Sequence, residues 1–331
     1  MCGLLMAATQ SLHGQPLHLS LPTDNTALLG GRHETFYMGV RRQGNLMWQG
    51  GTFGFVRSPL ATPHGTVFTQ FHEGIDIAPI KRDAGGLPLD VVGAIDAGTV
   101  VLCDTSGRSR YGLQVILRHD WPEGSIFSRY AHLRSIDVQA GQRVERGERL
   151  GVLGNTGGGL EMERAHLHLE INLMLNEGCD RSWLPGHVQD NMNPKFHPAN
   201  FAGIDPAALF TASKLQPSLS FAEFVKRQEV YFVVNAATVG PIDLLRRHPW
   251  LGDSTQAISR GCRISFTRWG LPVKFEALDE GPTEPQVSWV RASADKHAWH
   301  TARILSGEGE VASLDTAGKA LLKFLLGPEG H

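Results

Sequence analysis

The sequence has no excess of positive charge, no paired-cysteine motif and no long apolar run. Its 331 residues carry 31 Lys and Arg against 33 Asp and Glu, a formal net charge of −2, which gives no electrostatic reason to expect a nucleic-acid partner. The four cysteines show no C-x-x-C spacing, which argues against a cysteine zinc site and a dithiol redox motif. No run approaches membrane-spanning length, so no stable membrane span is expected.

Length and composition are those of an ordinary globular protein. Hydrophobic residues make up 41% and charged residues 19% of the chain, and this length predicts about two domains. We expect an N-terminal segment (1–50), a main domain (51–204) and a C-terminal domain (205–331) whose role the sequence does not reveal.

The first eight residues (MCGLLMAA) are apolar and end in small residues, but they lack the basic region that begins an export signal. They are either a plain N-terminus or the remnant of a signal that begins upstream. The second interpretation predicts an exported protein, located in the periplasm, in the cell envelope or outside the cell. In that setting a disulfide bridge between Cys179 and Cys262 also stays open.

Two stretches far apart in the sequence, 71–78 (FHEGIDIA) and 164–171 (RAHLHLEI), hold three histidines and an aspartate in short apolar surroundings. Polar and apolar residues alternate in the second stretch, so His166 and His168 point to the same face of a predicted strand. Their backbones would lie roughly 6–7 Å apart, close enough to share one small ligand.

The first stretch must bend if His72 and Asp76 are to share one ligand. Fully extended, His72 and Asp76 would lie about 13 Å apart, too far for one ion with ligand bonds of about 2 Å. Gly74 lies between them and can adopt backbone dihedrals closed to other residues. A helix is disfavoured by this glycine and by its isoleucine neighbours, so a bent strand is predicted.

Two imidazole nitrogens and one carboxylate oxygen suit a zinc ion, and three protein ligands leave a fourth position for water. Such an ion lowers the pKa of the water and polarises a substrate carbonyl. The residue types therefore indicate hydrolysis.

Five ordered motifs carry a resemblance to a known family. They are 72–76 (HEGID), 129–133 (RYAHL), 141–151 (GQRVERGERLG), 154–157 (GNTG) and 166–168 (HLH). In this order they resemble the lysostaphin-type zinc endopeptidases, which cleave peptide cross-links of bacterial peptidoglycan. The similarity covers about residues 50–200.

The resemblance implies a role for each matching residue. His72, Asp76 and His168 would be the ligands of Zn²⁺, and His132 and His166 the catalytic pair that moves protons and stabilises the oxyanion. Taken alone, residues 130–133 alternate like any half-buried strand, so His132 depends most on this context. No ligand is replaced.

The sequence departs from the family pattern next to the last motif. Ala165 and Leu169 stand where proline and phenylalanine are usual, and the approach segment 157–164 (GGGLEMER) also differs. These changes leave the expected activity intact, but the altered segment could change the substrate groove.

The main domain is predicted to be mainly β. Short strands separated by glycine, aspartate and proline turns favour an antiparallel sandwich or barrel, and the resemblance implies the duplicated hybrid motif type. The strand candidates are 91–95, 98–102, 113–118, 125–130 and 150–153. Residues 35–40 form another candidate, in a segment that either extends the sheet or lies across the cleft. Residues 180–200, with His187 and His197, are a candidate groove wall.

The C-terminal domain is predicted to be small and α+β. Helices are expected at 220–227, 241–247 and 315–326, and strands at 230–234, 263–267, 273–276 and 287–290. Four tryptophans, at 250, 269, 289 and 299, either pack in the core, which we favour, or line a wall-binding groove.

We therefore expect a zinc-dependent endopeptidase that hydrolyses peptide cross-links or stem peptides of bacterial peptidoglycan through a metal-activated water. One alternative is a catalytically silent cell-wall-binding or hydrolase-regulating protein of the same fold, but such proteins usually lose ligands. Another is a phosphocarrier of related topology, which would give His72 and Asp76 no role. The oligomeric state and the bond that is cut stay open.

Overall fold

The computed structural model describes residues 15–42, 44–184, 193–252 and 258–327. Residues 1–8, with the predicted signal remnant, and His187 lie outside these ranges. Within them, nine strands form the largest sheet, and all of its strand pairs are antiparallel. The strands are β5 (Ile75–Ile77), β6 (Val91–Gly93), β7 (Gly98–Asp104), β8 (Leu113–Trp121), β9 (Gly124–Ile136), β10 (Arg143–Val144), β11 (Arg149–Leu153), β12 (Leu167–Met174) and β13 (Phe201–Ile204).

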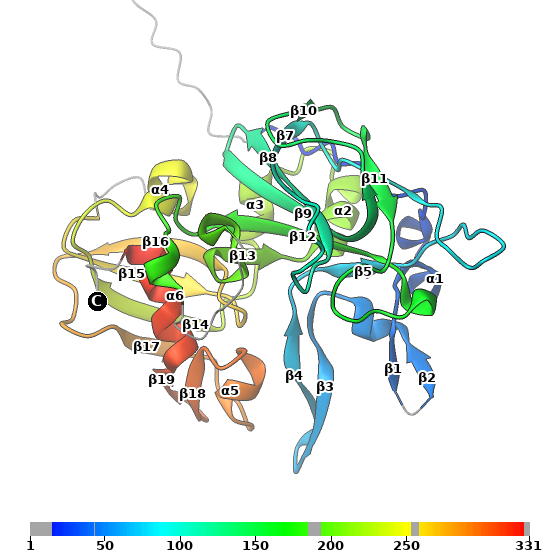
Figure 1. The fold of residues 1–331 in the computed structure, drawn as a ribbon. Helices are drawn as coiled ribbons and strands as arrows, with labels where there is room; N and C mark the ends of the chain where they lie inside the picture. Colours follow the sequence, from blue (N-terminus) through cyan, green and yellow to red (C-terminus); the bar gives the residue numbers. More distant parts are fainter. Residues whose placement is uncertain (1–14, 43, 185–192, 253–257, 328–331) are drawn as a thin grey trace, which may run out of the picture.

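The prediction of a mainly β, antiparallel fold is confirmed. The long strand β9 organises the sheet (Figure 1): one edge pairs with β8, and the other pairs first with β12 and then with β11. Strand β12 is buried along its whole length. Its apolar residues, Leu167, Leu169, Ile171 and Leu173, belong to the main hydrophobic core. Because side chains alternate along a strand, its polar residues share the opposite face.

Two hairpins extend from the same side of the main sheet (Figure 1). One is formed by β1 (Val40–Arg42) and β2 (Asn45–Met47), the other by β3 (Gly54–Thr62) and β4 (Gly65–His72). Strand β4 ends at His72, and two residues separate it from β5, so the second hairpin brings His72 to the edge of the sheet.

The predicted strand at 35–40 is wrong. Helix α1 (His33–Phe36) occupies its start, Tyr37 forms a single bridge to Ile77, and Val40 already belongs to β1, where it pairs with Met47. A strand would point Phe36 and Tyr37 to opposite faces, whereas the helical turn lets both be buried. The amide of Met38 donates to the carbonyl of Asp76. The segment therefore extends the sheet beside β5.

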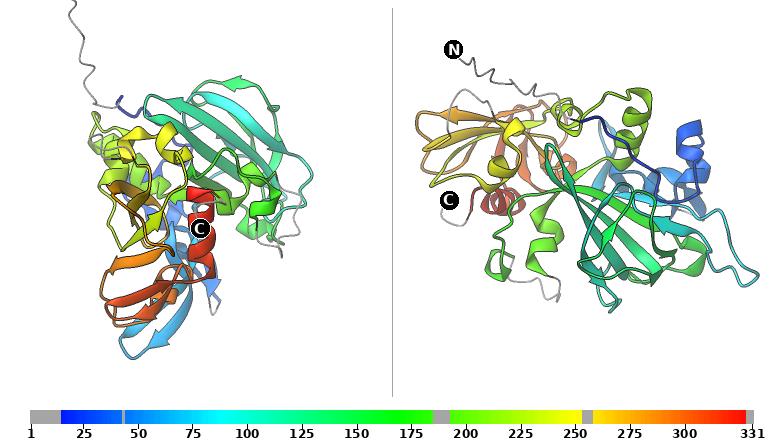
Figure 2. Two further views of the ribbon diagram at one scale, coloured as in Figure 1. Left: turned by 90° about the vertical axis from the view of Figure 1, so that its left-hand side faces the viewer. Right: turned by 90° about the horizontal axis from the view of Figure 1, so that it is seen from above.

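A second, four-stranded sheet follows residue 205, with strand order β16-β15-β14-β17. The strands are β14 (Phe232–Ala237), β15 (Gly261–Phe266), β16 (Pro272–Leu278) and β17 (Gln286–Val290), with a hairpin of β18 (Leu305–Glu308) and β19 (Val311–Leu314). The helices are α2 (Pro206–Leu215), α3 (Phe221–Lys226), α4 (Asp243–Arg247), α5 (His297–His300) and α6 (Thr316–Leu326). Figure 2 shows the four-stranded sheet beside the main sheet, whereas α2 contacts β12 of the main sheet. The domain boundaries stay predictions.

The helix termini follow local chemistry. Ser220 and Glu223 form a capping box at α3, and Asp315 caps α6, which stops before Gly327 at a φ of 90°. Helix α4 begins two residues after Pro241.

Short 3-10 helices are η1 (Ala27–Gly30), η2 (Trp48–Gly51), η3 (Met162–Arg164), η4 (Arg181–Trp183), η5 (Pro194–Phe196), η6 (Pro198–Asn200) and η7 (Pro249–Leu251).

The C-terminal elements pack against the β3–β4 hairpin. The indole of Trp269 lies 5.4 Å from the ring of Phe53 and 6.3 Å from that of Phe71, and its Nε1–H donates to the carbonyl of Gly203 at 2.9 Å. Trp269 is thus a packing residue, whereas Trp289 is 48% exposed.

The described residues contain neither the disulfide bridge left open by the sequence nor a membrane-spanning helix. Cys179 and Cys262 are free thiols there, so the bridge between them is not formed. No helix in the described part of the chain is long and apolar enough to cross a bilayer.

Candidate metal centre

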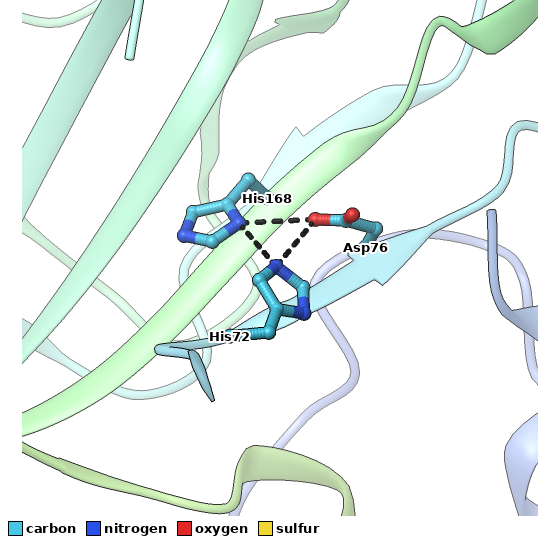
Figure 3. A group of neighbouring side chains, drawn as sticks. All are labelled: His72, Asp76 and His168. Carbon is cyan, nitrogen blue, oxygen red and sulfur yellow. Dashed lines mark hydrogen bonds and ion pairs between the residues drawn. The ribbon is translucent and has the colours of Figure 1, made fainter. Parts of the chain in front are cut away.

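Three of the predicted site residues meet at the edge of the main sheet (Figure 3). His72 ends β4, Asp76 lies in β5 and His168 in β12. Nε2 of His72 lies 3.1 Å from Oδ1 of Asp76 and 3.2 Å from Nδ1 of His168, and the last two atoms are 3.0 Å apart. Donor atoms on a tetrahedral zinc ion with bonds of about 2 Å are about 3.3 Å apart, so this triangle has the size that one ion needs.

The chain bends between the first two residues, as predicted. Glu73 and Gly74 separate β4 from β5. The expected reason was wrong, because Gly74 does not have a left-handed φ. A Cβ at this position would lie 2.3 Å from the carbonyl oxygen of Leu169. Glycine is therefore required by the close approach of β12, whose residue Leu169 pairs with Ile75.

Hydrogen bonds fix which nitrogen each imidazole presents. Nδ1 of His72 lies 2.8 Å from the carbonyl oxygen of Thr52, which can only accept, so Nδ1 carries the proton and Nε2 is free. Nε2 of His168 lies 3.1 Å from Oε1 of Glu170. A proton on that nitrogen leaves Nδ1 of His168 facing Asp76.

Glu170 is a residue that the sequence analysis missed. Besides His168, its carboxylate contacts Asn172, whose Nδ2–H donates at 3.0 Å, and Arg129, whose Nη1 lies 3.6 Å away. Burial acts to raise the pKa of Glu170, but Arg129 and these hydrogen bonds prevail and hold it below its usual range. The alternation that placed His166 and His168 on one face also places Glu170 there.

Arg129 is itself fully buried behind this carboxylate. Its guanidinium lies 4.1 Å from the ring centre of Tyr111 and donates from Nη2 to the carbonyl of Phe196 at 2.7 Å. A buried cation thus compensates the buried carboxylate that orients His168.

Asp76 has a second partner that the sequence did not indicate. Nη2 of Arg57 lies 2.5 Å from Oδ2 of Asp76, and Nε of Arg57 donates to the carbonyl of Gly50 at 2.8 Å. Burial acts to raise the pKa of Asp76, but His166 and His72 together hold it well below its usual range. Asp76 is therefore ionised, with Oδ2 held by Arg57 and Oδ1 facing the imidazoles.

His132 and His166, the predicted catalytic pair, lie beside this triangle. Their ring centres are 4.9 Å apart, and Nε2 of His166 lies 3.2 Å from Oδ1 of Asp76. In each ring Nδ1 donates to a backbone carbonyl, that of Arg164 at 2.7 Å for His166 and that of Thr156 at 2.8 Å for His132. Both Nε2 atoms therefore carry free lone pairs.

His132 reaches this face through a break in strand alternation. Its neighbour Ala131 pairs with His168, so a regular strand would turn His132 to the opposite face, with Tyr130. Instead, His132 has a left-handed φ of 60°, and the pairing of β9 with β8 shifts register between Tyr130 and Leu133. This bulge turns the imidazole toward His166 and His168.

Burial tunes the protonation of these rings. It lowers the pKa of His132 to about 3, with help from the neighbouring His166 and His168, so this ring is neutral at neutral pH. Burial also lowers the pKa of His72. For His168 burial acts in the same direction, but the bonds to Asp76 and Glu170 prevail and raise its pKa to about 9. A metal ion would therefore displace a proton from His168.

The segments expected to shape a groove are only partly described. His197 caps η6, because its Nδ1 accepts from the amide of Ala199 at 3.1 Å. In the approach segment, Gly157, Gly158 and Gly159 all have left-handed φ values. Whether these segments form the substrate groove stays a prediction.

Part of the chain is similar to known proteins. Two curated relatives are each 37% identical to the chain: the peptidoglycan DD-endopeptidase ShyA of Vibrio cholerae over 101 residues, and a lipoprotein NlpD/LppB homolog of Pseudomonas aeruginosa over 113 residues. The matches cover 30% and 32% of this chain, and 20% and 33% of those proteins. The chain thus spans about a fifth to a third of the length of these relatives.

Solved structures of similar proteins include the catalytic domain of lysostaphin from Staphylococcus simulans, at 22% identity and a TM-score of 0.29, covering 48% of this chain and 87% of that one. Residues 70–179, which contain all five predicted site residues, match Peptidase family M23. The chain therefore contains a peptidase domain of the lysostaphin-type M23 family.

Proposed function

We propose that this chain is a zinc-dependent endopeptidase that hydrolyses peptide cross-links or stem peptides of bacterial peptidoglycan. The triangle of Nε2 of His72, Oδ1 of Asp76 and Nδ1 of His168 carries the proposal, because its atoms lie 3.0–3.2 Å apart. The match to Peptidase family M23 and the similarity to a peptidoglycan DD-endopeptidase support it.

The donor set fits zinc. Two imidazole nitrogens and one carboxylate oxygen are typical of catalytic zinc sites, and three protein ligands leave one coordination position free. Thr52 and Glu170 hold the two imidazoles in the required tautomers. Bound there, zinc would polarise the scissile carbonyl and make water more acidic.

His132 and His166 would move the protons. The neutral ring of His132 can accept a proton at Nε2 while water attacks the peptide carbonyl carbon. His166, whose Nε2 faces Oδ1 of Asp76, would donate to the developing oxyanion only when Nε2 carries a second ring proton, in addition to the one that Nδ1 donates to Arg164. As the C–N bond breaks, the proton taken by His132 passes to the departing amine.

The proposed substrate implies a location outside the cytoplasm. Peptidoglycan lies beyond the inner membrane, so we expect the chain to act in the periplasm, in the cell envelope or outside the cell. Peptidoglycan peptides are its proposed partners. The names of the two relatives, a peptidoglycan endopeptidase and a lipoprotein, agree with this location.

A silent regulator of cell-wall hydrolysis is the second candidate, because one relative is an NlpD/LppB homolog rather than a named peptidase. Against it stands the presence of His72, Asp76, His132, His166 and His168 at one site, with the tautomers of all four imidazoles fixed by hydrogen bonds. A protein that only binds the wall needs no such arrangement.

Metal content and activity, measured on the same preparations, test the proposal. Zinc per chain is determined for wild type, His72→Ala and His132→Ala, and each is incubated with purified peptidoglycan and assayed for new amino termini. We expect about one zinc in wild type and His132→Ala, little in His72→Ala, and cleavage only by wild type. Zinc without cleavage of any peptidoglycan type would favour the regulator, and wild type that binds no added zinc would refute the proposed centre.

A further inference from the structure

A cavity of about 640 Å³ lies between the β1–β2 and β3–β4 hairpins. It is a recess of the two hairpins that Figure 1 shows extending from the sheet. The lining residues are Val40, Arg41, Arg42, Met47, Gln49, Gly50, Phe55, Val56, Arg57, Ser58, Pro59, Phe68 and Gln70. The cavity therefore combines aliphatic and aromatic walls with guanidinium groups.

The charged residues that line this cavity are all positive. Three arginines line the cavity, and no Asp or Glu is found among the described lining residues. Within the described part of the chain, the side chains of Arg41 and Arg42 make neither an ion pair nor a hydrogen bond. Both side chains are exposed, so their guanidinium groups are accessible to an anionic ligand.

The register of the first hairpin orients one of these arginines. Val40 pairs with Met47, and both line the cavity. Side chains two residues apart share a face of a strand, so Arg42 lies on the cavity side together with Val40. Arg41 lies on the other side of β1 and borders the cavity from there.

The third arginine joins this cavity to the candidate metal centre. Arg57 lines the cavity, yet its Nη2 lies 2.5 Å from Oδ2 of Asp76 and its Nε donates to the carbonyl of Gly50. Its side chain stays 23% exposed. One guanidinium thus separates Asp76 from whatever occupies the cavity.

We propose that this cavity binds an acidic residue of the substrate peptide, with its carboxylate held by Arg42 and Arg57 and the neighbouring aliphatic part of the peptide against Met47 and Phe55. The inference rests on the proposed function, because a peptide that reaches the metal centre has its flanking residues nearby. Guanidinium groups bind carboxylates through charge-assisted hydrogen bonds, and Arg42 is exposed on β1, where an incoming peptide can reach it.

A pair of peptides that differ only in charge tests this assignment. Acetyl-Ala-Glu-Ala-amide and acetyl-Ala-Gln-Ala-amide are titrated calorimetrically into the full-length chain carrying His132→Ala, so that no peptide bond is cut. We expect the glutamate peptide to bind about tenfold more tightly than the glutamine peptide. Adding Arg42→Gln should reduce this preference to within about twofold.

Arg143→Gln is the matched control, because Arg143 is exposed on β10, away from this cavity. It should keep the full preference for glutamate. Equal affinity for the two peptides, no binding of either, or an equal loss in the Arg143→Gln protein would overturn the assignment.

The acidic-peptide site and the proposed endopeptidase function can be refuted independently of each other. A preference for glutamate that depends on Arg42, in a protein whose wild type cuts no peptidoglycan, would leave the acidic-peptide site standing without the proposed function. Cleavage of peptidoglycan by a wild type that does not distinguish the two peptides would leave the function standing and refute the cavity's role.

Discussion

Nε2 of His168 lies 3.1 Å from Oε1 of Glu170, two residues further along the same strand. A proposed metal ligand and the carboxylate that orients it are therefore positioned by one short piece of β12. The contact between them therefore depends on the local geometry of β12 and not on the approach of a second strand. Arg129 and Asn172 in turn hold Glu170 in place.

Replacing Glu170 should weaken metal binding without removing a ligand. In Glu170→Ala we expect zinc affinity to fall by about 10–100-fold, because the His168 ring loses the contact that fixes its tautomer. Glu170→Gln keeps an oxygen acceptor and should lose less. Competition with a chromogenic chelator measures the affinity.

The control for this experiment is Glu161→Ala, at an exposed position. Its zinc affinity should equal that of wild type. Circular dichroism identifies any loss of fold caused by leaving Arg129 buried without its carboxylate. A folded Glu170→Ala protein with unchanged zinc affinity would contradict the orienting role.

Gly74→Ala should destabilise the protein, because the added Cβ meets the carbonyl oxygen of Leu169 at 2.3 Å and one of the two strands must shift. We expect a loss of about 1–3 kcal/mol in the free energy of unfolding, measured by denaturant titration. The control is Gly240→Ala, where a Cβ meets no atom within 4 Å and the change should stay within about 0.5 kcal/mol. Equal stability of the two variants would argue against the close approach.

Two substitutions of His132 can separate the effect of its left-handed backbone on stability from the effect of its imidazole on catalysis. Asparagine tolerates this conformation, whereas a β-branched residue does not. We expect His132→Asn to be as stable as wild type and His132→Val to lose about 1–2 kcal/mol. Neither variant should cleave peptidoglycan, and both should keep zinc. Equal stability of the two variants would contradict the bulge at this position.

His248 should make stability depend on pH. This buried ring donates from Nδ1 to the carbonyl of Glu123, and burial, together with the neighbouring Arg247, lowers its pKa to about 4 from an ordinary value of 6.5. Between these values the unfolded chain binds a proton that the folded protein does not. Stability is therefore fully present above about pH 6.5 and falls as the pH drops toward 4.

The measurement compares wild type with His248→Asn, whose side-chain amide keeps a donor for Glu123. The shift of about 2.5 units corresponds to about 3 kcal/mol. We expect the loss of unfolding free energy between pH 7 and pH 4 to be smaller in the variant by about this amount. Parallel pH curves would show that His248 does not cause the dependence.

The sequence predicted the residues that meet at the site better than it predicted what holds them. His72, Asp76, His166 and His168 lie in short motifs whose spacing limits where their side chains can point. Glu170 was within reach of the same alternation argument. Arg57, by contrast, meets Asp76 only because the β3–β4 hairpin folds back, and no local pattern encodes that contact.

Fold prediction failed where tertiary contacts outweighed local pattern. Residues 35–40 have β propensity, yet the burial of both Phe36 and Tyr37 favours a helical turn. His132 sits in an alternating stretch, and only the register shift between β8 and β9 brings it to the site. Helix α6 was well predicted because its cap, apolar run and terminal glycine are all local.

The proposed metal ligands are separated by much of the domain's length, since Asp76 and His168 lie 92 positions apart. During synthesis His72 and Asp76 leave the ribosome long before β12 exists, and β5 has no partner strand of the main sheet until β12 inserts beside it. A metal ion can therefore be captured only near the end of folding. Zinc content would then report how many molecules have completed the sheet, and a chain kept unfolded for transport would travel without its metal.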